Sequence, residues 1–125
     1  MSYKPIIVVS GEPNSVFLEI FFKSLKIHKY KSPIIIIASK KLLQAQMKKL
    51  SFFFEINIID KNLDRFNQLN NKKINLINVN FTFKRVFEKI SDKSNLYISE
   101  CFDVGLKLIK KKNFQRWFCL NKINN

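Results

Sequence analysis

Residues Gly11, Glu12 and Pro13 form the segment of this sequence that is best placed to contact a ligand. They follow a short apolar run rich in β-branched residues, Ile6 to Ser10, and precede a segment with helical periodicity. In open α/β sheets, the loop between the carboxyl end of a strand and the next helix is where ligands bind, phosphates especially. The single glycine falls short of the glycine-rich patterns that bind dinucleotides or nucleoside triphosphates. An ordinary strand-to-helix turn is therefore the alternative interpretation of this loop.

The other residues with catalytic potential are few and isolated. His28 is the only histidine, and the lysines around it near the end of a helical segment favour a structural or surface role. One histidine cannot provide a three-histidine metal site. Cys101 falls on the apolar face of a predicted helix and Cys119 in an apolar strand-like run, so both are expected to pack rather than react. We therefore expect no catalytic residue and no metal ligand within this chain.

Hydrophobic periodicity predicts the elements that position the loop. Apolar runs predict strands at 6–10, 34–38, 53–60 and 74–79, and a strand-like run covers 114–120. Spacings of three to four residues predict helices at 15–28, 40–50 and 94–112. Asn14 or Ser15 is the expected N-cap of the first helix, and Ser39 and Ser94 are those of the other two. For segment 81–90 the sequence is compatible with either an extended connection or a short helix.

The order of these elements predicts an α/β fold. Short right-handed crossovers convert the order β-α-β-α-β-loop-β-α into a largely parallel sheet with helices on both faces. Tyr97, Cys101, Val104 and Leu108 are expected to form the apolar face of the last helix. Residues 1–125 read as a single α/β segment without an internal repeat or linker.

Composition limits the class of protein. The chain has 125 residues and is 46% hydrophobic, which excludes global disorder. No apolar run approaches the roughly 18 residues of a membrane span, and the first residues lack the pattern of a secretory signal. Two cysteines without metal-binding spacing suit a reducing compartment, so we expect a cytoplasmic location.

The net charge of +14, from 23 Lys+Arg against 9 Asp+Glu, raises a nucleic-acid or other polyanion partner as the alternative function. Lysine, isoleucine, asparagine and phenylalanine are all abundant, and all are encoded by A- and T-rich codons, whereas arginine is rare. A coding bias of this kind raises the lysine content without selection for a polyanion partner. No RRM, KH or zinc-finger signature accompanies the lysine pairs, so solvated surfaces are the favoured interpretation. DNA affinity that survives about 0.15 M salt would favour a small basic α/β module instead.

Three segments carry a resemblance to a known family. They are the run from Lys4 to Pro13 (KPIIVVSGEP), Glu19 in the helix that follows, and the run from Ser32 to Leu43 (SPIIIIASKKLL). With its order of elements, the chain resembles the N-terminal third of the 4-hydroxythreonine-4-phosphate dehydrogenases. That family opens with a strand, a Gly-Asp/Glu-Pro loop and a helix, then a strand ending in a small-residue pair before a helix with Leu-Leu. Segment 97–112 is similar to its long helix, with Gly105 as the small residue.

The resemblance implies part of the isocitrate/isopropylmalate dehydrogenase-like fold. It also implies NAD-dependent oxidation with decarboxylation of 4-phosphohydroxy-L-threonine, in the pathway to pyridoxal 5′-phosphate. Members of the family are homodimers that use a divalent metal (Zn, Mg or Co), held by three histidines in a cleft between two α/β domains. Those histidines have no counterpart in these 125 residues. The resemblance thus implies a truncated or split piece that is inactive alone, completed by a second copy or a C-terminal part, with Gly11, Glu12 and Pro13 as its cleft loop.

Overall fold

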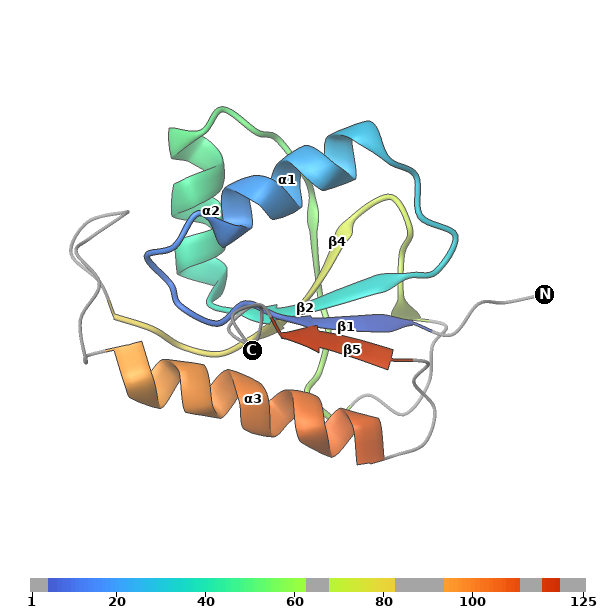
Figure 1. Ribbon diagram of the computed structural model, residues 1–125. Helices are drawn as coiled ribbons and strands as arrows, with labels where there is room; N and C mark the ends of the chain where they lie inside the picture. The colour runs from blue at the N-terminus through green and yellow to red at the C-terminus, as the bar shows by residue number, and fades with distance from the viewer. Residues whose placement is uncertain (1–4, 63–67, 83–93, 111–115, 120–125) are drawn as a thin grey trace.

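The computed structural model describes residues 5–62, 68–82 and 94–110, and the backbone of 116–119. Within these ranges the chain forms three layers, with a parallel sheet between helices (Figure 1). The elements are β1 (Ile6–Val9), α1 (Phe17–Ile27), β2 (Ile34–Ala38), α2 (Lys40–Lys49), β3 (Ile56–Ile58), β4 (Ile74–Asn78), α3 (Asn95–Lys110) and β5 (Arg116–Cys119). The predicted α/β class and the parallel sheet are confirmed. Most of segment 81–90, for which the sequence left two interpretations, lies outside the described residues.

The five strands lie in the order β3-β4-β2-β1-β5, and every pairing is parallel. Helices α1 and α2 cover one face and α3 covers the other (Figure 1). The crossover from β2 therefore passes over one face, while the long connection from β4 leads to the opposite face. In open α/β sheets such a change of direction opens a crevice at the carboxyl ends of the strands.

Strand β2 lies in the middle of the sheet and contributes to two apolar cores. Ile35 and Ile37 pack toward α3, whereas Ile36 and Ala38 pack toward α1 and α2. All four are fully buried. A strand covered on both faces requires apolar residues at consecutive positions, which explains the uninterrupted run in the sequence.

Helix α1 begins at Phe17, later than predicted, because Ser15 belongs to the preceding turn. The Ser15 hydroxyl donates to the Glu12 carbonyl at 2.9 Å and accepts from the Phe17 amide at 3.3 Å. Val16 occupies the N-cap position and makes no side-chain cap bond. The prediction of Asn14 or Ser15 as N-cap is therefore wrong.

Strand β3 is shorter than the predicted 53–60, and only Ile56–Ile58 pairs, with β4 alone. Phe53 is 89% exposed and Ile58 is 51% exposed. Phe52 and Phe54 instead pack against Phe22 of α1, with ring centroids 5.5 and 6.2 Å from it. The chain covers this end of the α1–α2 core before it enters the sheet, which leaves little length for pairing.

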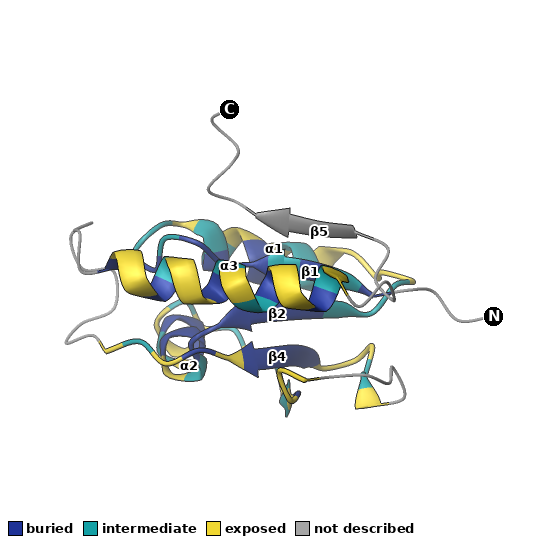
Figure 2. Ribbon diagram, turned by 90° about the horizontal axis from the view of Figure 1, so that it is seen from below, coloured by how far each residue is buried: buried dark blue, intermediate teal, exposed yellow. Residues whose placement is uncertain are grey.

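Two local predictions are confirmed. The Ser39 hydroxyl accepts from the Leu42 amide at 3.2 Å and caps α2. On α3, Tyr97, Cys101 and Leu108 are buried against the sheet, and exposed residues face outward (Figure 2). The last predicted residues of this helix, 111–112, lie outside the described ranges.

Candidate functional site at the carboxyl edge of the sheet

The loop after β1 is shaped by a backbone conformation that only glycine adopts readily. Gly11 has a φ of 69°, in the left-handed region, and its neighbour Ser10 is buried. The chain therefore turns sharply at the carboxyl edge of the sheet before it enters α1. Gly11, Glu12 and Pro13 lie at this turn, as the sequence predicted.

The Glu12 carboxylate holds the loop in place. Its Oε1 accepts from the Asn14 amide at 3.1 Å and from the Ser94 hydroxyl at 3.4 Å. Ser94 directly precedes α3, so this half-buried carboxylate joins the loop to the helix on the other face of the sheet. A negative charge here disfavours a phosphate close by, and it suits a hydroxyl or amine of a ligand.

Tyr97 connects three elements at the same edge. Its hydroxyl accepts from the Ser39 amide at 2.8 Å and shares a hydrogen bond of 3.1 Å with the Ser10 hydroxyl. The ring is buried, and the ring centroid of Phe81 lies 4.8 Å away. Burial raises the pKa of the Tyr97 phenol well above its usual value near 10, although the bonds from Ser10 and Ser39 act in the opposite direction. Tyr97 was predicted as an apolar-face residue, and its hydroxyl role was missed.

Tyr97→Phe is expected to lower the free energy of unfolding by about 1–3 kcal/mol, because the buried Ser39 amide loses its partner. In the native protein the neutral phenol is favoured. Tyr97 therefore stabilises the fold fully below pH 10, and this contribution falls by about 1.4 kcal/mol per pH unit above it. Urea unfolding between pH 8 and 11 measures both effects. An equal loss of stability above pH 10 in Tyr97→Phe would contradict this assignment.

Two side chains that the sequence did not single out also support the edge. The Asn78 Oδ1, at the end of β4, accepts from the Lys40 amide at 2.8 Å at the start of α2. The fully buried Gln46 of α2 donates to the Pro13 carbonyl at 3.0 Å. Gln46 was missed because apolar spacing reports only the apolar residues of a buried helix face, here Leu42, Leu43 and Met47. The available signal for Asn78 was a polar residue near the end of the predicted strand 74–79.

The remaining predicted residues do not join this cluster. His28 directly follows α1 at the opposite edge and is exposed, and Cys101 is buried on the sheet-facing side of α3. Cys119 lies in β5, whose side chains are not described. Among the described residues, no group of three His, Cys, Asp or Glu side chains could hold a metal ion.

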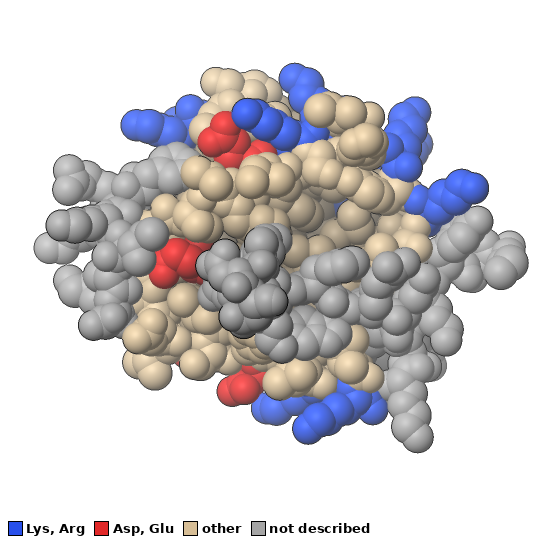
Figure 3. Space-filling model, in the orientation of Figure 1, with Lys and Arg blue, Asp and Glu red and all other residues tan. Residues whose placement is uncertain are grey.

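The described lysines on the face shown in Figure 3 lie at separate places around the outline rather than in one patch. None of the described helices is long and apolar enough to cross a bilayer.

A search of protein-family models and a search of curated proteins found no match. Among solved structures, the chain is similar to a crystal structure of a 4-hydroxythreonine-4-phosphate dehydrogenase from Burkholderia phymatum, with a TM-score of 0.75 and 18% sequence identity. The match covers 94% of this chain and 36% of that structure. At this identity the likeness concerns the fold: the chain adopts an α/β fold that matches part of a dehydrogenase.

Proposed function

We propose that this chain forms one wall of a ligand cleft in a protein related to the 4-hydroxythreonine-4-phosphate dehydrogenases. The loop of Gly11, Glu12 and Pro13 would contact the hydroxylated, phosphorylated substrate. One observation carries the proposal: a fold that matches part of such an enzyme places this loop at the carboxyl edge of the sheet, with its carboxylate held by hydrogen bonds.

The chemistry of the loop suits the hydroxyl side of such a substrate. The Glu12 carboxylate is already oriented by Asn14 and Ser94, so it can accept a hydrogen bond from a substrate hydroxyl or ammonium group with little rearrangement. Ser10, Ser39 and Tyr97 keep the ends of β1 and β2 and the start of α3 together behind it. The proposed role of these residues is to position the substrate.

The cofactors of the family do not fit the described residues. NAD would accept a hydride in such an oxidation. The loop has one glycine and a carboxylate beside it, which is unfavourable for a dinucleotide pyrophosphate. We propose that NAD and the divalent metal, where the assembly uses them, are held by a second copy or by a complementary chain. The isolated 125-residue chain is then inactive.

Two measurements test this proposal on the same protein. With 4-phosphohydroxy-L-threonine, NAD and a divalent metal, we expect no NADH above a buffer control. In an NMR titration with the same substrate, we expect the amide signals of Gly11 and Glu12 to shift. Glu12→Gln should weaken this binding about tenfold, because a hydrogen bond to a charged group contributes about 1.5–3 kcal/mol.

Glu100→Gln is the matched control, because Glu100 is exposed on α3 and lies outside the loop. It should leave the titration unchanged. Formation of NADH that a chelator abolishes and added metal restores would contradict the predicted inactivity. Equal effects of the two substitutions, or no shift at the loop, would overturn its role in binding.

A further inference from the structure

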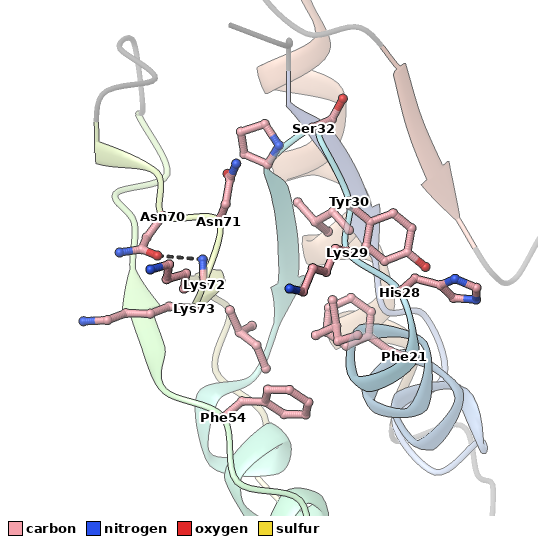
Figure 4. Close-up of a pocket in the computed structure, with 14 residues that line it drawn as sticks. Phe21, His28, Lys29, Tyr30, Ser32, Phe54, Asn70, Asn71, Lys72 and Lys73 are labelled. Atoms are coloured by element: carbon pink, nitrogen blue, oxygen red, sulfur yellow. Dashed lines mark hydrogen bonds between the residues drawn. The ribbon is translucent and has the colours of Figure 1, made fainter.

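A groove of about 550 Å³ lies at the amino-terminal edge of the sheet, opposite the Glu12 loop. It is bounded by the end of α1 and the following connection on one side, and by the turn 70–73 on the other (Figure 4). Ile34 and Ile74, the first residues of β2 and β4, lie between these walls. Its volume is within the range of small-molecule pockets, roughly 300–1,000 Å³. We call this feature the amino-edge groove.

The floor of the amino-edge groove is apolar. It is formed mainly by Phe21, Leu25, Ile34, Phe54 and Ile74. Phe21 and Phe54 reach it from α1 and from the segment before β3, and so approach from different elements (Figure 4). An aromatic or branched aliphatic group placed here would be removed from water, at a gain of about 25 cal/mol per Å² of apolar surface.

The rim is basic. Lys29 extends into the groove from the connection after α1, and Lys72 and Lys73 belong to the turn on the other side (Figure 4). No Asp or Glu is among the described residues that line the groove. Lys73 pairs with Glu55 at 3.2 Å, whereas within the described ranges Lys29 and Lys72 make no ion pair. The groove thus combines an apolar floor with two lysines that have no acidic partner among the described residues.

The turn that carries Lys72 is held rigidly by Asn75, which is 1% exposed at the start of β4. The Asn75 Oδ1 accepts from the Asn57 amide side chain and the Asn70 backbone amide, both at 2.9 Å. Its Nδ2 donates to the carbonyls of Ile34 at 3.1 Å and Asn70 at 3.0 Å. The Asn70 Oδ1 in turn accepts from the Lys72 amide at 2.7 Å. The wall is therefore formed before any ligand arrives, which lowers the entropic cost of binding.

We propose that the amino-edge groove binds a small amphipathic anion, with its apolar body on Phe21 and Phe54 and its charged group near Lys29 and Lys72. Charge complementarity excludes a cationic ligand, and the apolar floor disfavours a bare inorganic anion. The size of the groove suits one or two rings with a single carboxylate, sulfonate or phosphate. This site is independent of the Glu12 loop.

The test uses naphthalene-2-sulfonate as the probe and naphthalene-2-sulfonamide as its neutral counterpart, in NMR titrations of the whole chain. We expect the sulfonate to shift signals from Phe21, Ile34 and Phe54 and to bind at least fivefold more tightly than the sulfonamide. The double variant Lys29→Gln/Lys72→Gln should lose at least fivefold in affinity for the sulfonate. Both lysines are at the surface, so neither change should unfold the protein.

The matched control is Lys107→Gln/Lys110→Gln on the exposed face of α3, which removes the same charge elsewhere and should leave affinity unchanged. Glu12→Gln should also leave the affinity for the sulfonate unchanged. A failure of the groove proposal can therefore be distinguished from a failure of the proposed role of the Glu12 loop. Equal affinity for both probes, equal losses in the two double variants, or no binding would each overturn the proposal. Sedimentation identifies one alternative: self-association weakened by Lys29→Gln/Lys72→Gln, without sulfonate binding, would mean that a second copy covers the groove.

Discussion

Phe22→Ala is expected to lower the free energy of unfolding by about 3–5 kcal/mol, the largest effect of a single substitution that we predict. Phe22 is fully buried on the inner face of α1, and its ring centroid lies 5.5 Å from that of Phe52 and 6.2 Å from that of Phe54. Removing it leaves a cavity between the helix and the chain segment that leads into β3. Urea unfolding followed by circular dichroism measures the change.

Phe53→Ala is the matched control, because Phe53 is 89% exposed between the two phenylalanines that contact Phe22. We expect it to change the free energy of unfolding by no more than about 0.5 kcal/mol. Because both variants replace phenylalanine by alanine, their difference measures the effect of burial on the free energy of unfolding. Comparable losses for the two variants would contradict the packing of Phe52 and Phe54 against Phe22 with Phe53 exposed between them.

Gly105→Val is expected to destabilise the fold by about 3 kcal/mol through overpacking. A Cβ at Gly105 would lie 3.0 Å from Val9 Cγ2 and 3.4 Å from Ile37 Cδ1, at the contact of α3 with the sheet. Val9 and Ile37 are fully buried in central strands and have little room to move. The two further methyl groups of valine worsen the clash. Thermal and urea unfolding measure the loss.

A control substitution and a double-mutant cycle separate the effect of the close contact from that of helix propensity. Ser99→Val places valine at an exposed position of the same helix and should cost less than about 1 kcal/mol. In a double-mutant cycle, Val9→Ala removes the atom nearest the new Cβ, so Gly105→Ala should be better tolerated in that background. Additive effects in the cycle, or equal costs at positions 99 and 105, would show that α3 does not approach β1 this closely.

The sequence by itself determined those elements whose signals are local. Five consecutive apolar residues predicted the buried strand Ile34–Ala38, and Ser39 predicted the start of α2, because the length of an apolar run and a capping side chain act within a few residues. The periodicity of α3 likewise predicted its buried face. The loop of Gly11, Glu12 and Pro13 was predictable as a candidate site, since a turn signal directly followed a buried strand.

Local signals did not determine how far β3 would pair. The alternation of residues 53–60 matched a strand, yet only Ile56–Ile58 joins the sheet. Phe52 and Phe54 gain more by packing against Phe22 than by extending an edge strand. Packing between distant segments overrides strand propensity here, and periodicity alone does not report such competition.

Only the tertiary structure decided which polar groups meet. The Tyr97 hydroxyl reaches Ser39, 58 residues earlier, and Ser10, 87 residues earlier, because α3 crosses the face of β1 and β2. Asn75 is a polar residue in a strand, and its hydrogen bonds to Asn57 and Ile34 exist only because β4 lies between β3 and β2. Strand order depends on which apolar faces of distant segments pack together. The sequence around one residue therefore does not show which hydrogen bonds that residue makes to other strands.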